Sequence, residues 1–321
     1  MIAFVLYILL GFVILTVGAE ALVRGSAGIA RRAGLSALVV GLTIVAFGTS
    51  APEMAVSIGS AVAGKGDLAI GNVVGSNIFN VAVILGIAAL ICPLQVHLQV
   101  LRWDMPIMLG ASLLGVLFIF SAAQVGRWEG LVLFSGVVAY TVMAVRMARR
   151  ESPSLAQSAG EAFPTEQVGE SKGGLPLQIV LTLAGIGLLI LGAQLLVINA
   201  VGLAQILGIS EAVIGLTIVA TGTSLPELAT SAVAAFRKET DIAVGNIVGS
   251  NLFNILSILG ATALIAPIPL GNIGWLDFGF MLGTSLLLLP LMRTGFRIDR
   301  WEGTLLLVSY GVYLYLRWPK S

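Results

Sequence analysis

Two polar stretches inside a very apolar chain decide its fold: GLTIVAFGTSAPE at residues 41–53 and DLAIGNVVGSNIFN at residues 67–80. Both return in the second half, as GLTIVATGTSLPE at 215–227 and DIAVGNIVGSNLFN at 241–254. A shift of about 174 positions aligns these blocks without a gap, and about 31 of the 53 residues from Val39 to Ile91 are identical to their counterparts. The motif RWEG at 127–130 returns at 300–303. The whole chain is therefore one unit used twice.

Composition indicates that this unit lies in a membrane. Hydrophobic residues make up 58% of the chain, charged residues 10%, and the mean hydropathy is +1.03. A soluble domain has about 25% charged residues, so lipid must be the solvent for much of this surface. A single cysteine, Cys92, excludes an intramolecular disulfide framework. The apolar start of the chain has no basic leading segment and no cleavage site, so we expect a first spanning helix there and not a signal peptide.

The hydropathy pattern predicts an all-α integral membrane protein with ten transmembrane helices. A span needs about 20 mostly apolar residues, and that rule predicts spans at 2–23, 36–60, 67–91, 105–123, 128–147, 176–199, 210–236, 241–266, 275–292 and 301–317. Residues 148–175, rich in Ser, Gly, Pro and Glu, are expected to form a solvated linker between the five-helix repeats 1–147 and 176–321. Because each repeat has an odd number of helices, the second copy is inverted, and inverted repeats are an architecture of secondary transporters.

The loop charges predict the orientation. With the N-terminus outside, roughly thirteen Lys and Arg residues fall on the cytoplasmic side and about four on the external side, as the positive-inside rule requires. We therefore expect both termini to be external, the linker to be cytoplasmic, and the protein to lie in the plasma (inner) membrane.

Glu53 and Glu227 stand at equivalent places in the middle of two predicted spans. A charged residue at the bilayer centre costs about 2.5–3.5 kcal/mol on insertion scales, and neither segment supplies an adjacent Lys or Arg. A bound cation would compensate these charges. The alternative is a pair of protonated carboxyls that hydrogen bond to their neighbours, but ionisable groups inside membranes are functional by default.

Proline precedes each glutamate, as Pro52 and Pro226. Proline removes one helical hydrogen bond and displaces the carbonyl four residues earlier, and Gly48 and Gly222 loosen the same turns. The pattern G-T-S-x-P-E therefore predicts a broken helix whose free carbonyls lie near its own glutamate. Carbonyl and carboxylate oxygens are ligands of hard cations. An ordinary proline kink is the alternative, and its occurrence twice beside a glutamate argues against it.

Hydroxyl and amide side chains surround these positions in the sequence. Taken singly, Thr49, Ser50 and their counterparts Thr223 and Ser224 are more often hydroxyls bonded to the backbone than ligands. Four-residue spacing puts Ser76 with Asn80, and Ser250 with Asn254, on one helix face, where their oxygens can line a site between helices. For the remaining asparagines we favour hydrogen bonds between helices, and these are Asn72, Asn77, Asn246 and Asn251.

The ligand types narrow the chemistry further. Oxygen-only ligands favour Na⁺ or Ca²⁺ over zinc or copper, which prefer nitrogen and sulfur. No Walker-type loop is present in the sequence, so ion gradients are the expected energy source. The glycine–serine elements have no His or Lys base nearby, so we expect neither a membrane hydrolase nor any other enzyme. We expect no cofactor, no nucleic acid partner and no obligate protein partner; the partners are Ca²⁺, Na⁺ and the lipid bilayer.

The paired GTSxPE and GNxVGSNxFN blocks resemble the two α-repeats of the sodium/calcium exchanger family, within the cation/calcium antiporter superfamily. The resemblance covers nearly the whole chain and is closest to the compact prokaryotic form. It implies four adjoining sites, with Ca²⁺ held by the carboxylates of Glu53 and Glu227 and the carbonyls of Thr49 and Thr223. It also implies one sodium site at Ser50, Ser76 and the Ala46 carbonyl, a mirror site at Ser224, Ser250 and the Ala220 carbonyl, and a central position at Asn80 and Asn254.

The mechanism that this resemblance implies is alternating access, with exchange of Ca²⁺ for Na⁺. Some family members carry an aspartate at one of the two central positions, whereas this sequence has asparagine at both, which leaves two carboxylates. A Ca²⁺/H⁺ exchanger or a K⁺-linked cation exchanger would use the same scaffold. A cation channel, which conducts without a counter-ion, is the alternative from a different functional class.

Overall fold

The computed structural model is almost entirely helical and describes residues 1–121, 124–162, 174–207, 220–269 and 273–317. The helices of the first half are α1 (Ile2–Ala33), α2 (Ala37–Val40), η1 (Gly41–Val45), α3 (Ala46–Thr49), α4 (Ala51–Val62), α5 (Gly66–Phe79), η2 (Asn80–Ile84), α6 (Leu85–Ile91), η3 (Val100–Asp104), α7 (Met105–Ser121) and α8 (Arg127–Ala162). Those of the second half are α9 (Leu175–Ile206), α11 (Ala220–Gly222), α12 (Leu225–Phe236), α13 (Thr240–Phe253), η5 (Asn254–Leu259), α14 (Gly260–Ile265), α15 (Trp275–Arg293) and α16 (Arg300–Arg317). The segments labelled η are π-helical turns that continue the neighbouring α-helices.

Seven of the described helices are long and apolar enough to cross a membrane, and a bent pair raises the number to at most eight. The bent pair joins Ala37–Thr49 to Ala51–Val62 at an angle of 45°. This count does not reach the ten spans expected from the sequence. The span expected at 210–236 begins among residues outside the described ones, and α16 has charged residues at both of its ends, namely Arg300, Glu302 and Arg317.

Three helices run further than the hydropathy pattern predicts. Helix α1 continues to Ala33 and α9 to Ile206, well past the expected ends at 23 and 199. Helix α8 continues to Ala162, so the first part of the expected linker 148–175 is helical, and residues 163–173 lie outside the described part. Hydropathy marks only the apolar part of a helix, whereas the helical hydrogen bonds continue into its polar end.

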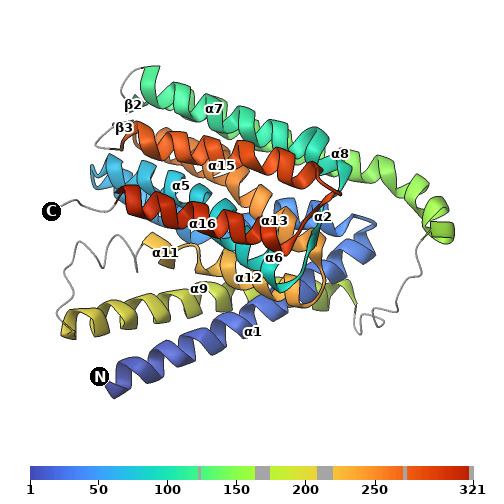
Figure 1. Cartoon of the computed structure of the whole chain (residues 1–321), viewed down its shortest axis with the longest axis horizontal. Helices are drawn as coiled ribbons and strands as arrows, with labels where there is room; N and C mark the ends of the chain where they lie inside the picture. Colours follow the sequence, from blue (N-terminus) through green and yellow to red (C-terminus); the bar gives the residue numbers. More distant parts are fainter. Residues whose placement is uncertain (122–123, 163–173, 208–219, 270–272, 318–321) are drawn as a thin grey trace.

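Helices α1 and α9 form a layer of their own along one side of the molecule (Figure 1). They pack along glycines: a Cβ atom on Gly18 would lie 3.0 Å from the Gly185 carbonyl oxygen, and one on Gly192 would lie 2.8 Å from the Leu15 nitrogen. The outer faces of both helices expose large apolar side chains such as Leu6, Phe12 and Leu183. Such outer faces suit contact with lipid. Between the two helices, the small glycines let the backbones approach closely, as is common in membranes.

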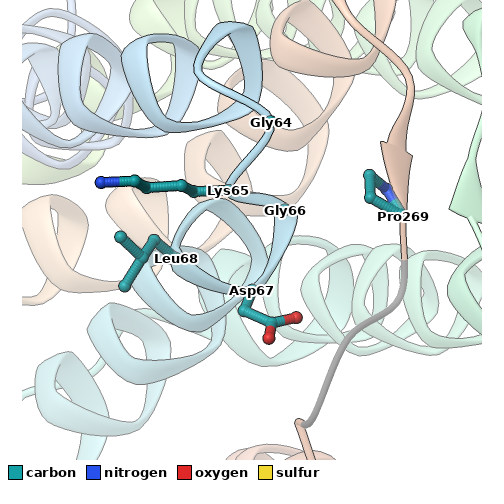
Figure 2. Close-up of a pocket in the computed structure, with 6 residues that line it drawn as sticks. All are labelled: Gly64, Lys65, Gly66, Asp67, Leu68 and Pro269. Atoms are coloured by element: carbon teal, nitrogen blue, oxygen red, sulfur yellow. The ribbon is translucent and has the colours of Figure 1, made fainter.

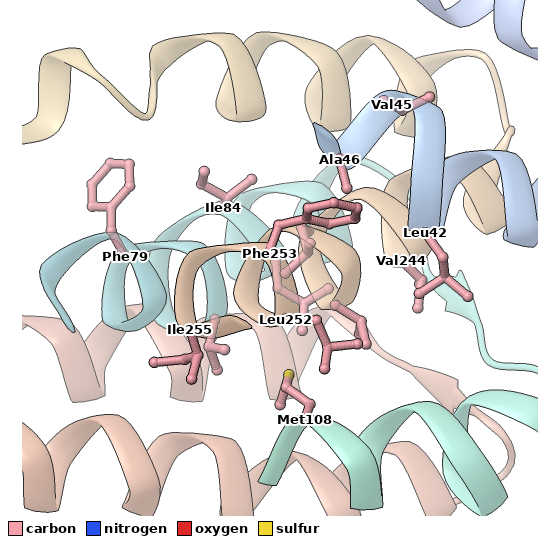
Figure 3. Close-up of a cluster of buried hydrophobic side chains, with 14 of the residues drawn as sticks. Leu42, Val45, Ala46, Phe79, Ile84, Met108, Val244, Leu252, Phe253 and Ile255 are labelled. Carbon is pink, nitrogen blue, oxygen red and sulfur yellow. The ribbon is translucent and has the colours of Figure 1, made fainter. Parts of the chain in front are cut away.

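The centre of the molecule is built around α13, whose spanning segment is completely buried. Figure 3 shows its apolar side chains, among them Val244 and Leu252, between Leu42 of η1 and Met108 of α7. A Cβ atom on Gly249 would lie 2.6 Å from the Leu42 carbonyl oxygen, so glycine is what lets η1 approach so closely. This contact joins the first half of the chain to the second, because Leu42 lies in the polar stretch 41–53 and Gly249 in the polar stretch 241–254.

Two short antiparallel sheets also connect the halves. Strand β1 (Leu94–Gln95) pairs with β4 (Arg297–Ile298), and β2 (Gln124–Val125) pairs with β3 (Ile268–Pro269). The sequence shift relates β1 to β3 and β2 to β4, so each sheet joins one loop from each copy. Both sheets satisfy backbone groups at the helix ends and fix the two halves to one another.

Gly185 tests the close contact of α1 with α9. A Cβ atom there would lie 2.5 Å from the Leu22 nitrogen, whereas one on Gly187, two residues along the same helix, meets no described atom within 4 Å. We expect Gly185→Ala to lower the melting temperature in detergent, since overpacking costs about 1–3 kcal/mol. Gly187→Ala is the matched control and should leave it unchanged or raise it slightly, because alanine favours helix. Equal melting temperatures for the two variants would contradict the glycine contact.

Candidate cation site

The first carboxylate lies directly after a break in a helix. Helix α3 ends at Thr49, Ser50 has non-helical backbone angles, and α4 begins at Ala51 with Pro52 and Glu53 in its first turn. The break that the G-T-S-x-P-E pattern predicts is therefore present and is the 45° bend. It places Glu53 at the amino-terminal end of α4, where backbone N–H groups and the helix dipole favour a negative charge.

The second carboxylate repeats this arrangement. Helix α11 ends at Gly222, α12 begins at Leu225, and Pro226 and Glu227 lie in its first turn. Both glutamate side chains are buried, with only 1% of each exposed. They are connected through two serines, because each glutamate accepts a hydrogen bond from the serine three residues before the other one. Two acidic side chains from opposite halves of the chain therefore meet inside the protein.

Hydroxyl groups cross between the halves to bind these carboxylates. The Ser50 hydroxyl donates to Glu227 Oε1 over 3.1 Å, and the Ser224 hydroxyl donates to Glu53 Oε1 over the same distance. Ser224 Oγ also lies 3.2 Å from the hydroxyl of Ser76. Each glutamate is therefore bound by the serine that precedes the other glutamate, so neither half contains a complete site.

Two asparagines fix the backbone that carries the glutamates. Asn72 Nδ2 donates to the Glu53 carbonyl oxygen at 3.1 Å and to Ser57 Oγ at 3.0 Å. Asn246 Nδ2 makes the equivalent bonds to the Glu227 carbonyl oxygen at 3.4 Å and to Ser231 Oγ at 2.9 Å. The helix-to-helix bonding expected of these asparagines is thus observed. The sequence analysis did not single out Ser57 and Ser231. Each stands four residues after the glutamate of its own copy, which is the one signal that could have identified them.

The same asparagines reach the two threonines of the G-T-S motifs. Thr49 Oγ1 donates to Asn246 Oδ1 at 3.1 Å, and Thr223 Oγ1 donates to Asn72 Oδ1 at 3.3 Å. Thr49 Oγ1 also lies 3.3 Å from the carbonyl oxygen of Ala46. Both hydroxyls are therefore used to connect the halves. The residue that matches Ala46 in the second copy, Ala220, opens α11, and its side chain is outside the described part.

A second pair of crossed bonds lies at the start of the π turns. Asn80 Nδ2 donates to Asn251 Oδ1 at 3.1 Å, and Asn254 Nδ2 donates to Asn77 Oδ1 at 3.0 Å. Asn80 begins η2 and Asn254 begins η5, and π turns inside α-helices are frequent at functional sites. Because the amide nitrogens are used in this way, the side-chain oxygens of Asn80 and Asn254 remain for another ligand.

Several oxygen atoms at the meeting point of the halves are buried without a hydrogen bond partner among the described residues. They are Glu53 Oε2, Glu227 Oε2, Asn80 Oδ1, Asn254 Oδ1 and Ser250 Oγ. A buried acceptor that makes no hydrogen bond costs about 1–3 kcal/mol, and more when it is charged. All five belong to residues that the sequence assigned to the site. Five unsatisfied oxygens, two of them from carboxylates, are a ligand set for a hard cation.

A surface pocket of about 400 Å³ lies elsewhere, at the turn from α4 to α5 beside β3 (Figure 2). Its lining residues are Gly64, Lys65, Gly66, Asp67, Leu68 and Pro269. The pocket has one acidic and one basic side chain and shares no residue with the buried oxygens. The buried carboxylates, and not this pocket, are therefore the candidate cation site, because a cation needs several converging oxygens.

Comparison with known proteins identifies relatives over the full length of the chain. The model of the sodium/calcium exchanger protein family matches residues 3–146 and 177–318. A putative antiporter, CaxA from Alkalimonas amylolytica, is 39% identical over 318 residues, which are 97% of each chain. The sodium/calcium exchanger MaX1 from Methanosarcina acetivorans is 33% identical over 341 aligned positions, covering 96% of this chain and 97% of that protein. Among solved structures, the sodium-calcium exchanger NCX_Mj soaked with Na⁺ and Ca²⁺ has a TM-score of 0.83, 30% identity and complete coverage of both chains.

Asn246 tests the asparagine framework of the site. Asn246→Ala removes the donor to the buried Glu227 carbonyl and to Ser231, so we expect a loss of about 1–3 kcal/mol of stability. Asn199→Ala is the matched control, since the Asn199 amide donates to the Leu195 carbonyl of its own helix and to no other residue that the structure describes. Thermal unfolding in detergent should show a clear decrease for Asn246→Ala and little change for Asn199→Ala. A decrease of the same size in both variants would refute the special role of Asn246.

Proposed function

The chain belongs to the sodium/calcium exchanger family, and on that premise we propose that it exchanges Ca²⁺ for Na⁺ by alternating access. The family is one of membrane antiporters, which carry cations and perform no covalent chemistry. One observation carries the proposal: Glu53 and Glu227 are both buried, and each is bound by a serine of the opposite half. Such a buried site can be reached from water only when helices around it move.

The proposed ligands are those that the family implies, and the unsatisfied oxygens of Glu53, Glu227 and Ser250 support part of the set. Ca²⁺ would be bound by the carboxylates of Glu53 and Glu227 with the backbone carbonyls of Thr49 and Thr223. Na⁺ would be bound on either side, by Ser50, Ser76 and the Ala46 carbonyl and by Ser224, Ser250 and the Ala220 carbonyl. Asn80 and Asn254 would line the central position. Their side-chain oxygens support this placement, because they have no hydrogen bond partner among the described residues.

The proposed architecture is that of ten helices in two inverted repeats, 1–147 and 176–321, with residues 148–175 between them. The separate matches of the family to residues 3–146 and 177–318 support this division. We place the protein in the plasma (inner) membrane with both termini external and the linker cytoplasmic. The support for this orientation is the excess of Lys and Arg on the side of the linker.

Charge explains why such a site would exchange ions and not leak. Two glutamates neutralise one Ca²⁺ or about two Na⁺, so the occupied site passes an apolar barrier at low cost. The empty site carries two buried negative charges, and burying unpaired charge is strongly unfavourable. The protein would therefore change between its two open states only when loaded. A channel has no such requirement, and the buried position of both carboxylates favours the antiporter.

Ion substitution tests which counter-ion is coupled. Purified protein in liposomes, loaded with Na⁺, K⁺ or choline at matched pH, should take up ⁴⁵Ca²⁺ only when Na⁺ is inside, because Na⁺ must leave on the sites that Ca²⁺ enters. Uptake driven by K⁺ or by a pH gradient alone would show that K⁺ or H⁺ is the coupled ion, and it would leave the proposed Ca²⁺ site unchanged. Uptake that is equal in all three conditions would indicate a channel.

The glutamates test the site itself. Glu53→Gln and Glu227→Gln keep the shape of the side chain but remove one of two charges, so we expect calcium exchange to fall to background in both variants. Glu129→Gln is the control, since Glu129 lies at the start of α8 and contributes no oxygen to the buried cluster. Exchange by either site variant at more than about half the wild-type rate would refute the assignment, provided that the variant elutes as folded protein.

A further inference from the structure

The two halves contain a second pair of buried acids, far from the cation site in the sequence. Asp104, at the end of η3, accepts a hydrogen bond from the Tyr140 hydroxyl at 3.0 Å. Asp277, in the first turn of α15, accepts one from the Tyr313 hydroxyl at 2.9 Å. The repeat relates Asp104 to Asp277 and Tyr140 to Tyr313. Both aspartates are almost fully buried, with 1% and 3% exposed.

The two acids differ in their remaining partners. Asp277 Oδ2 lies 2.8 Å from Arg317 and also accepts from the Gly274 backbone N–H at 3.1 Å. Among the described residues, the second oxygen of Asp104 accepts one bond, of 3.4 Å, from the side-chain amide of Gln99. The repeat position that matches Arg317 is Ala144, which is buried and has no charge. The first copy therefore keeps the acid and the tyrosine but has no cation.

The elements around Asp104 supply no other counter-charge. Helix α7 has no titratable residue, and α15, which contacts η3, has Asp277 at its far end and Arg293 at its near end. Arg293, Arg102 on η3 and Arg146 on α8 are exposed, and none forms an ion pair with Asp104 in the part of the chain that the structure describes. Of the titratable groups that the structure describes, the Tyr140 hydroxyl is the one that bonds to this carboxyl.

We propose that Asp104 is a proton-binding site separate from the cation site, and that its twin Asp277 is ionised against Arg317. A buried carboxylate without a counter-charge is strongly unfavourable, and binding a proton removes that charge. The hydrogen bonds allow it, because a protonated Asp104 can donate to the Tyr140 oxygen or, after rotation of the amide, to the Gln99 oxygen. The repeat thus contains one neutral and one ionic version of the same contact. This inference does not depend on the proposed exchange of Ca²⁺.

Infrared difference spectroscopy distinguishes the two forms directly. We expect the spectrum of the wild type minus that of Asp104→Asn, at mildly acidic pH, to show the carbonyl stretching band of one protonated carboxyl group. Asp277→Asn, the matched control, should instead lose only carboxylate bands. Contributions of Glu53 and Glu227 cancel in both differences. Loss of carboxylate bands alone in Asp104→Asn would overturn the proposal.

Two further variants keep the test decisive if Asp104→Asn does not fold. Tyr140→Phe retains the packing but removes the hydrogen bond, so it should shift the protonated carboxyl band; a shift confined to carboxylate bands would overturn the proposal. Arg317→Ala removes the counter-charge of Asp277 and should add a second protonated carboxyl band, whereas an unchanged spectrum would refute the argument from counter-charge.

Stability against pH gives an independent readout. If the folded protein keeps the Asp104 proton to higher pH than the unfolded chain, the folding equilibrium constant falls by up to tenfold per pH unit as pH rises between those two points. Asp104→Asn should remove that component, so its melting temperature should decrease less than that of the wild type as the pH is raised from acidic to alkaline values. Parallel pH profiles of the two proteins would contradict the proposal.

Discussion

The structure depends on the cost of burying two carboxylates inside a protein whose surface faces lipid. Each is bound by a hydroxyl from the opposite half, Ser224 for Glu53 and Ser50 for Glu227. Because these bonds cross, neither half can satisfy its own acid. Asn72 and Asn246 then fix the backbone on which the acids stand. The helices packed around α13 and the two antiparallel sheets, each with one strand from either half, also hold the two halves together.

The two copies have nearly the same sequence in this region but not the same surroundings. Ser76 bonds to Ser224, whereas its counterpart Ser250 has no hydrogen bond partner among the described residues. Asp277 has an arginine where Asp104 has an amide. The serine difference is one of conformation, because the two residues are identical. The aspartate difference is one of sequence, because Ala144 stands where the second copy has Arg317.

How much the sequence predicted is clear from particular residues. The break before Glu53 followed from Pro52 and Gly48, because proline cannot continue a preceding helix but is tolerated in the first turn of a new one. The pairing of Glu53 with Glu227 followed from the repeat. The bonds of Asn72 to Ser57 and of Asn246 to Ser231 did not, since a hydroxyl four residues after an acid has many possible partners. The helical part of the linker was not predicted either, because its composition is that of a solvated loop.

By itself the sequence determined the class of protein, the repeat and the acids at its centre. These depend on composition, spacing and the chemistry of single residues, and they hold whatever the packing. The tertiary structure alone decided which hydroxyl binds which carboxylate, which asparagine oxygens stay unsatisfied, and that Asp104 lacks the cation that Asp277 has. The first two facts depend on contacts between residues more than 150 positions apart, such as Thr223 with Asn72, and the third depends on contacts between separate helices, such as Asp277 with Arg317. No local pattern encodes such contacts, because they arise only when the helices of both halves pack together.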